Sequence, residues 1–348
     1  MRTFWPPSIS RRFLALALAV ALTLPVASVN AQDGAPGFSS YVQLLAARAR
    51  AEGVSEPTIR RMTHDLTPNE RVIALDRAQP GTPTSSGFPL LSAYIARHVD
   101  QARIRGGRNV HAAIGPMARQ IEQNYGVPAS VAVAIFGHET NYGTFTGDFD
   151  LARSLATLAW EGRRRDLFAG EFVALLKIAD KGVARDQLKG SWAGAFGYPQ
   201  FLPSVYLRLA TDGDGDGRSN IWSSRADALA SIANYLRDAG WRQGQPWGVA
   251  ASIPQALDRD SLGTRLASPV CARVHQRHSV WKTAREWRNL GVRPLAPLGD
   301  DVMATLFEPD GPGKGAWLLT GNYRVILEYN CSNYYAMSVG LLADEILR

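Results

Sequence analysis

The chain has 348 residues, of which 46% are hydrophobic and 20% are charged, and its formal net charge is +7. This composition is typical of a globular protein with enough apolar mass for a core and room for more than one lobe. The two cysteines are too few for a disulfide-rich scaffold. The sequence also lacks a basic stripe interleaved with aromatic residues, which argues against nucleic-acid binding.

The first 31 residues have the pattern of a secretory signal peptide. Arg2, Arg11 and Arg12 precede or open a short apolar stretch that ends in small residues at Ala31. The stretch is short for a membrane span, and no Cys follows the expected cleavage site. We therefore expect an exported chain without a lipid anchor, with an uncleaved anchor as the alternative. Loss of the three arginines leaves a net charge of +4, which is consistent either with solubility alone or with an anionic cell-envelope polymer as partner.

The rest of the chain is predicted to be mainly helical, with a small sheet near its end. Apolar residues recur three and four positions apart from Tyr41 onward, and helical periodicity resumes after a Pro/Gly/Ser-rich linker at 78–89. Later runs such as WLLTGNYRVILEY are β-rich, and the last helix is amphipathic. We expect a mainly α (α+β) chain with four parts after the signal: an N-terminal helical lobe at 32–120, a helical core at 121–243, a β-rich insertion at 244–328, and a C-terminal strand end and helix at 329–348 that return to the core.

The motif GHETNYG, residues 137–143, places a carboxyl group on an apolar helical face. A helix is expected to begin at Val127-Pro128 and to end near Gly143. Residues three, four and seven positions apart share one face of a helix. The residues at these positions before Glu139 are all apolar: Phe136, Ile135 and Ala132.

Glu139 is therefore a candidate general acid. Burial and the negative end of the helix dipole both oppose its charge, so its pKa is expected to be raised, and a carboxyl group that stays protonated near neutral pH can donate a proton. One alternative is a structural glutamate that pairs with an arginine at 163–165 or points outward at the helix end. A zinc protease motif, H-E-x-x-H, is excluded because Tyr142 stands in place of the second histidine.

Alternate aspartates in TDGDGDGRSNIW predict a cation-binding loop of the EF-hand type. With Asp212 at position 1, Gly217 stands at position 6, but Ser223 replaces the usual Glu at position 12. Hard cations take several oxygen ligands, so we expect a structural Ca²⁺, with Na⁺ or a solvated turn as alternatives. Asp227 is included either as a substitute carboxylate or as a cap of the next helix. The candidate ligands are Asp212, Asp214, Asp216, the Arg218 carbonyl, Asn220 and Asp227.

The two cysteines, Cys271 and Cys331, could pair in an oxidising compartment, but their spacing alone does not decide this. His275 and His278 follow Cys271, yet their spacing matches no common zinc motif.

Four sequence blocks carry a family resemblance: GHETNYG at 137–143, GSWAGAFGYPQFLPSVY at 190–206, DGDGDGRSNIWSSRADALASIANYL at 212–236 and GNYRVILEYNCSNYYAMSVGLLAD at 321–344. In this order they resemble the B-type lytic murein transglycosylases, glycoside hydrolase family 103. The resemblance implies a lysozyme-like core that includes the EF-hand-like loop. It also implies a periplasmic, monomeric enzyme that cleaves the β-1,4 bond between N-acetylmuramic acid and N-acetylglucosamine without water and leaves a 1,6-anhydro ring. Glu139 would act first as acid and then as base.

The resemblance also implies a set of substrate-binding residues, most of them aromatic, because a flat ring packs well on a sugar face. For each tyrosine, core packing is the alternative. The residues are Ser191, Gln200, Tyr235, Tyr329, Asn330, Tyr335 and, by a looser match, Tyr94. Peptidoglycan strands are the implied substrate, no organic cofactor is implied, and complexes for wall synthesis or division are candidate partners. Two other functions stay open: a lysozyme-like hydrolase with Asp148 or Asp150 as second acid, and a non-catalytic, calcium-stabilised wall-binding protein.

Overall fold

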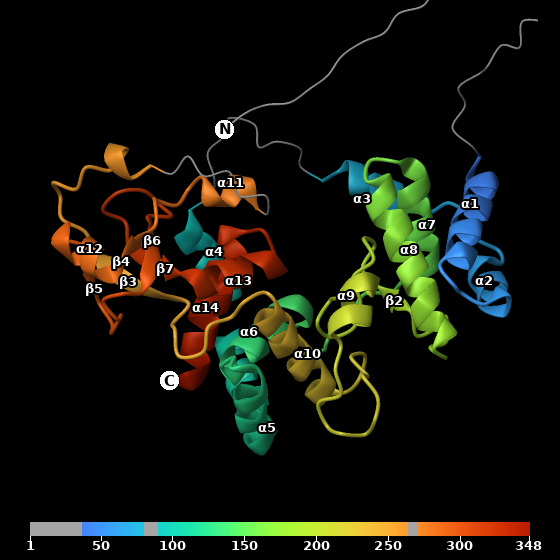
Figure 1. Cartoon of the computed structure of the whole chain (residues 1–348), viewed down its shortest axis with the longest axis horizontal. Helices are drawn as coiled ribbons and strands as arrows, with labels where there is room; N and C mark the ends of the chain where they lie inside the picture. The colour runs from blue at the N-terminus through green and yellow to red at the C-terminus, as the bar shows by residue number, and fades with distance from the viewer. Residues whose placement is uncertain (1–36, 80–89, 264–270) are drawn as a thin grey trace, which may run out of the picture. The chain divides into compact units, whose positions relative to one another are not determined.

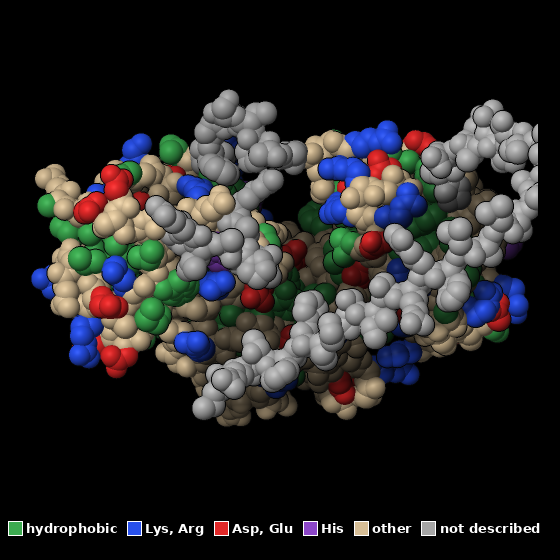
Figure 2. All heavy atoms as spheres, turned by 45° about the horizontal axis from the view of Figure 1, so that its top comes forward, with side chains coloured by type: hydrophobic (Ala, Val, Ile, Leu, Met, Phe, Trp, Pro, Cys, Tyr) green, Lys and Arg blue, Asp and Glu red, His purple; other side chains and the backbone are tan. Residues whose placement is uncertain are grey.

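The computed structural model describes residues 37–79, 90–263 and 271–348. The predicted signal peptide lies outside the described residues. Within them, no helix is both long and apolar enough to cross a membrane. On the face shown in Figure 2, basic and acidic side chains are interspersed over the described surface.

The first apolar core joins the N-terminal helices to a later helical pair. Helices α7 and α8 pack against each other, and α1, α2 and α3 cover them (Figure 1). Asn69 and Asp150 cap α3 and α7 by accepting backbone N–H bonds, which satisfies donors that a helix start leaves free. The helices are α1 (Phe38–Ala51), α2 (Glu56–Thr63), α3 (Glu70–Arg77), α7 (Leu151–Glu161) and α8 (Arg165–Asp180).

The second apolar core surrounds one helix that is apolar on all sides. This helix, α6 (Ala129–Thr140), contacts α5, α10 and α14, and such a helix is stable only when it is covered all round. Its neighbour α14 also contacts α4 and α5. The surrounding helices are α4 (Leu91–His98), α5 (Gln101–Tyr125), α10 (Arg225–Asp238), α13 (Gly321–Tyr329) and α14 (Asn333–Leu347).

The third core lies on a five-stranded antiparallel sheet of order β4-β6-β7-β3-β5. Leu318 of β7 stands opposite Val249 of β3 and Leu306 of β6. Trp287 of α12 is fully buried against the sheet, and its Nε1 donates to the Ala304 carbonyl at 2.9 Å. The elements here are β3 (Gly248–Ser252), η1 (Asp260–Leu262), α11 (Ala272–His275), β4 (Lys282–Thr283), α12 (Ala284–Asn289), β5 (Arg293–Pro294), β6 (Met303–Phe307) and β7 (Ala316–Thr320).

A two-stranded sheet and one short helix complete the described elements. Strand β1 (Phe149–Asp150) pairs with β2 (Lys189–Gly190), and α9 (Pro203–Leu209) packs on α8. The prediction of a mainly helical chain with a small sheet late in the sequence is thus confirmed. The expected N-terminal lobe at 32–120 contributes to two cores, since residues 38–77 lie in the first and residues 91–125 in the second.

Two local predictions were wrong. The run WLLTGNYRVILEY is strand only as far as Thr320, whose hydroxyl accepts a hydrogen bond from the Asn322 amide and so starts α13. The expected end of α6 at Gly143 is also wrong, because the helix ends at Thr140 and Asn141 takes a left-handed φ of 49°. A side-chain N-cap begins a helix and a left-handed Asn ends one, and apolar periodicity reports neither.

Candidate functional site

Helix α6 holds Glu139 at its last turn. Ala132, Ile135 and Phe136, the residues predicted to share its face, are all fully buried. Glu139 itself is half-buried because the helix ends one residue later. The predicted position of a carboxyl group on a buried apolar face is therefore confirmed.

The end of α6 is fixed by a tyrosine that lies against glycines. The Tyr142 hydroxyl donates to the Arg103 carbonyl of α5 at 2.7 Å. A Cβ at Gly137 would stand 2.6 Å from the Tyr142 ring, and one at Gly106 would meet the same ring at 2.6 Å. Gly137 and Tyr142, the first glycine and the tyrosine of GHETNYG, thus pack against each other and hold α6 against α5 beside Glu139.

Glu139 has one direct side-chain hydrogen bond among the described residues. The Tyr335 hydroxyl, from α14, donates to Glu139 Oε1 at 2.6 Å. Burial raises the pKa of Glu139 to about 7, and the hydrogen bond from Tyr335 acts in the opposite direction. The raised pKa agrees with the sequence prediction. At neutral pH a substantial fraction of Glu139 therefore carries a proton.

The predicted alternative of an ion pair between Glu139 and an arginine at 163–165 is wrong. Arg163 and Arg164 both bond to buried Asp76, at 3.3 and 2.6 Å. Arg165 donates to the Trp160 carbonyl instead. Arg163 and Arg164 thus satisfy a different buried carboxylate, and none of the three arginines pairs with Glu139.

Tyrosines predicted for the site gather near Glu139. Burial first, and then the charge of Glu139, raises the pKa of Tyr335, of Tyr329 and of Tyr94. All three therefore remain protonated phenols that can donate hydrogen bonds. Tyr94 also stacks on His98, with ring centroids 3.7 Å apart.

Tyr235 and Tyr329 form an aromatic cluster with a third ring. Their centroids are 4.8 Å apart, and the Phe201 centroid lies 6.1 Å or less from both. Their hydroxyls donate to backbone carbonyls, Tyr235 to Glu328 at 2.8 Å and Tyr329 to Pro199 at 2.6 Å. Sequence reasoning missed Phe201, although an aromatic residue directly after Gln200 was a usable signal.

Gln200 and Ser191 support the turn that carries this cluster. Gln200 has a left-handed φ of 52°, and its Nε2 donates to the carbonyls of Thr146 and Gly197 at 3.1 and 3.0 Å. Ser191 Oγ accepts from the Ala195 amide at 3.0 Å. Asn330, by contrast, is exposed at the end of α13, and no hydrogen bond joins it to Glu139 in the part of the chain that the structure describes.

The surroundings of His138, next to Glu139, favour a structural rather than a catalytic role. Burial, followed by the charge of Arg103, lowers the pKa of His138 to about 3. Its Nδ1 lies 3.1 Å from Arg103 Nη1, and its ring packs 5.7 Å from that of Tyr335. A permanently neutral imidazole in this place packs behind the Tyr335–Glu139 pair, in agreement with the structural interpretation.

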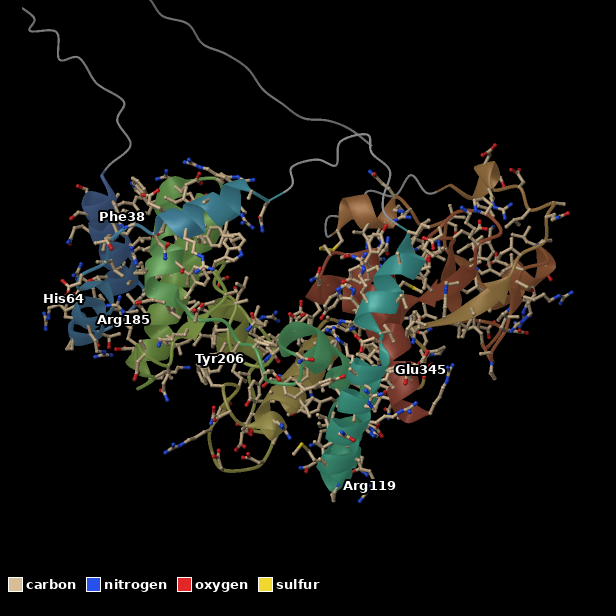
Figure 3. All side chains as sticks on the ribbon, turned by 180° about the vertical axis from the view of Figure 1, so that it is seen from behind. Phe38, His64, Arg119, Arg185, Tyr206 and Glu345 are labelled. Atoms are coloured by element: carbon tan, nitrogen blue, oxygen red, sulfur yellow. A yellow bond between two sulfur atoms is a disulfide. The ribbon has the colours of Figure 1, made fainter. Side chains whose placement is uncertain are left out.

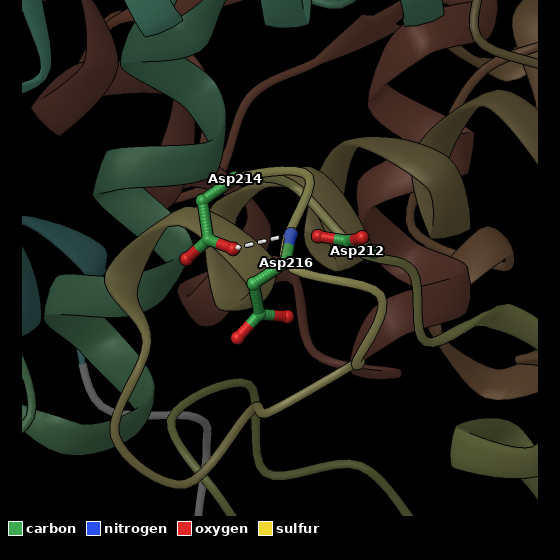
Figure 4. Close-up of side chains that lie close together, drawn as sticks. All are labelled: Asp212, Asp214 and Asp216. Carbon is green, nitrogen blue, oxygen red and sulfur yellow. Dashed lines mark hydrogen bonds between the residues drawn. The ribbon is translucent and has the colours of Figure 1, made fainter.

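The aspartate loop brings three predicted ligands together (Figure 4). One carboxylate oxygen from each of Asp212, Asp214 and Asp216 lies within 4.8 Å of the others. Asp212 accepts from the amides of Gly215 and Gly217 at 2.6 and 2.7 Å, and both glycines have a left-handed φ. Converging carboxylate oxygens on a tight loop fit a hard cation such as Ca²⁺.

Asp227 supports the same loop from inside. It is fully buried, and its two oxygens accept from the amides of Gly213 and Asn220 at 2.8 and 2.6 Å. It lies outside the cluster of three. The Asn220 side chain bonds to Ser223, so it too is engaged within the loop.

Comparison with known proteins identifies the family. A family model described as a transglycosylase SLT domain matches residues 37–344. The chain belongs to this family. A relative from Escherichia coli (strain K12), membrane-bound lytic murein transglycosylase B, is 36% identical over 232 residues, which cover 64% of this chain and 58% of the relative. The match therefore spans less than two thirds of that relative's own length.

Two solved structures extend this comparison with the transglycosylase SLT domain family. SltB3 from Pseudomonas aeruginosa, in complex with NAG-anhNAM-pentapeptide, superposes with a TM-score of 0.79 at 36% identity. The match covers 89% of this chain and 80% of the SltB3 chain. Slt35 from Escherichia coli, in complex with calcium, has a TM-score of 0.72 at 27% identity and covers 88% and 92%. The predicted lysozyme-like transglycosylase fold is thus confirmed.

In this SLT domain neither of the two downstream aspartates shares a hydrogen bond with Glu139 among the described residues. Asp150 caps α7 and pairs with Arg185 at 2.8 Å. Asp148 is exposed. A hydrolase would use a second carboxyl group several ångström from Glu139 rather than in direct contact with it, so these contacts do not decide between the two reactions.

The cysteines of this SLT domain are paired. Cys271 and Cys331 form a disulfide with a Cα–Cα distance of 5.2 Å, which settles the question that their spacing left open. Nearby His278 bonds through Nε2 to buried Asn333 at 2.8 Å. Within the described residues the one group of acids, His and Cys close enough to hold a metal is the aspartate loop.

Proposed function

We propose that this chain is a lytic transglycosylase that cleaves the β-1,4 bond between N-acetylmuramic acid and N-acetylglucosamine and leaves 1,6-anhydro ends. The observation that carries the proposal is Glu139, a half-buried carboxyl group whose pKa is raised to about 7 and which meets a tyrosine hydroxyl instead of a second carboxylate. Family membership and the muropeptide bound to the related SltB3 support peptidoglycan as the substrate.

The reaction needs one group that first gives and then takes a proton. Protonated Glu139 donates to the bridging oxygen as the C1–O bond breaks, so the leaving sugar departs as an alcohol. The N-acetyl oxygen of the substrate stabilises the positive charge that develops at C1. Glu139, now a carboxylate, removes the proton of the C6 hydroxyl, whose oxygen bonds to C1. The ring closes, Glu139 is protonated again, and no water is consumed.

Tyrosines around Glu139 support both halves of this cycle. The Tyr335 hydroxyl stabilises the carboxylate that exists between the two proton transfers. The rings of Tyr235 and Tyr329, packed on buried Phe201, offer flat faces for sugar rings. Gln200 and Ser191 hold the turn that precedes Phe201.

The aspartate loop is proposed to hold a structural Ca²⁺. The calcium complex of the related Slt35 and the convergence of Asp212, Asp214 and Asp216 support this assignment. Bound there, a divalent cation neutralises carboxylates that otherwise repel one another. We also infer export to the periplasm, from the signal-like residues 1–31.

Digestion of purified sacculi, with mass analysis of the soluble products, tests the proposal. The expected result is anhydro-muropeptides from the wild-type chain and none from Glu139→Gln, which keeps the side-chain shape but has no proton to give. Muropeptides with reducing muramic acid ends would establish a hydrolase instead. Intact glycan with bound protein would establish a binding protein.

A further inference from the structure

A cavity of about 520 Å³ lies between the end of α8, helix α9 and the aspartate loop. Its wall contains two aromatic rings, two basic side chains and several amides and hydroxyls, and no carboxylate. None of the residues assigned above to catalysis or sugar binding lines it. The residues that matter here are Lys181, Gln187, Tyr206, Arg218 and Trp222.

The aromatic part of the wall is rigid. Trp222 and Tyr206 have centroids 5.2 Å apart, and both pack on buried Phe196 of the first core. The Tyr206 hydroxyl donates to the Ser219 carbonyl at 3.1 Å, which ties α9 to the loop. Figure 3 labels Tyr206 in this part of the molecule. Rings held from behind offer a preformed flat surface of the kind on which a pyranose ring packs.

The charges of the wall are unbalanced. Lys181 and Arg218 are exposed, and neither side chain has a hydrogen-bond or ion-pair partner among the described residues. Most other basic side chains near the first core do have partners, as Lys177 has in Glu52 and Arg185 in Asp150. Two uncompensated cations beside a cavity without acids attract an anion.

We propose that this cavity is a second binding site for the wall polymer, which holds a sugar ring against Tyr206 and Trp222 and a pendant carboxylate between Lys181 and Arg218. This inference rests on the proposed function, because it takes the same polymer as ligand. A long polymer bound at two places on one chain stays attached between cleavage events, since the second contact forms at a high effective concentration.

Co-sedimentation with purified sacculi tests this site without turnover when every protein carries Glu139→Gln. Lys181→Glu reverses one charge of the cavity wall, and Arg119→Glu makes the same change at an exposed position on α5 (Figure 3). Both variants are assayed in excess calcium, and equal melting temperatures establish that both are folded. We expect Lys181→Glu to raise the sacculus concentration for half-maximal sedimentation about tenfold, while Arg119→Glu changes it less than about twofold.

The chemistry of the ligand is tested with two modified polymers. In sacculi whose carboxylates are converted to amides, the difference between the two variants should disappear. An amidase removes the peptide carboxylates and frees one carboxylate on each muramic acid. A difference that disappears in such strands assigns the anion to the peptide, and one that persists shows that the two cations also accept the freed sugar carboxylate.

Three outcomes would overturn the inference, and the first two leave the proposed function untouched. Equal sedimentation of the two variants removes the site, and a difference that survives amidation removes the carboxylate. If the Glu139→Gln parent does not sediment at all, peptidoglycan is not the ligand, and the proposed function fails together with this site.

Discussion

The pKa of Glu139 is set by two opposing contacts, and one of them can be removed alone. Burial raises this pKa to about 7, whereas the hydrogen bond from Tyr335 stabilises the carboxylate and limits the rise. The first proton transfer of the proposed reaction requires protonated Glu139, so activity should fall as pH increases through this pKa.

Tyr335→Phe should shift that fall to higher pH. A hydrogen bond to a charged group contributes about 1.5–3 kcal/mol and one pH unit corresponds to about 1.4 kcal/mol, so the shift should be about one to two pH units. The measurement is the rate of anhydro-muropeptide release between pH 5 and 9, with Tyr41→Phe in α1 as control. An unchanged alkaline limb would show that Tyr335 does not set the acidity of Glu139.

Glu139→Gln should stabilise the fold at alkaline pH. The folded-state pKa of about 7 exceeds the ordinary glutamate value of 4.5, so the native chain binds more protons between these values and loses stability as pH rises through them. Above pH 7 the buried carboxylate destabilises the fold by an amount of about 1–3 kcal/mol, which glutamine removes. Urea unfolding of wild type and variant should differ at pH 8 and agree at pH 4.5. A constant difference at both pH values would contradict a raised pKa.

At the scale of elements, α14 sits between the site and the sheet. It carries Tyr335 toward Glu139 and presents Gly340 to Trp247, where a Cβ would lie 2.4 Å from the indole ring. That ring is fixed, because it stacks on Trp317 and its Nε1 donates to Asp344. A side chain at 340 therefore has to displace an indole that is packed on two sides.

Gly340→Ala should destabilise the chain by about 1–3 kcal/mol through overpacking. Gly170→Ala in α8 is the matched control, since the nearest atom to a Cβ there belongs to the Arg48 guanidinium, at 3.8 Å. Replacement of an unobstructed helical glycine by alanine should stabilise by about 0.5–1 kcal/mol. Thermal or urea unfolding measures both, and changes of the same sign would contradict the close packing of Gly340.

These elements also show what the sequence could predict. The face of α6 that bears Glu139 was predictable because helical periodicity is local, and the aspartate loop because its spacing is short-range. The Tyr335–Glu139 bond joins residues 196 positions apart, and no periodicity encodes such a contact. Tyr335 was found only through family resemblance. Phe201 was missed, and the pairing of Cys271 with Cys331 was undecided, because both depend on long-range packing.

At the scale of the whole molecule, the aspartate loop connects two cores. It follows α9, which packs on α8 of the first core, and precedes α10, which packs on α6 beside Glu139. The Ser231 hydroxyl of α10 accepts from the Thr211 amide at 3.0 Å, and Asp227 of α10 holds the loop backbone. The loop geometry is thus coupled to both cores, and an ion that stabilises the loop should stabilise the whole fold.

Added Ca²⁺ should therefore raise the melting temperature of the complete chain. At one hundred times its dissociation constant, a ligand that binds only the folded state contributes about 2.7 kcal/mol, which corresponds to several degrees for a chain of this size. Asp216→Ala should abolish this response, because it removes one of three converging carboxylates, whereas exposed Asp148→Ala should keep it. A calcium response of equal size in both variants would place the ion elsewhere. The response should also be lost with Asp212→Ala, since Asp212 belongs to the proposed ligand cluster and also accepts from the amides of Gly215 and Gly217.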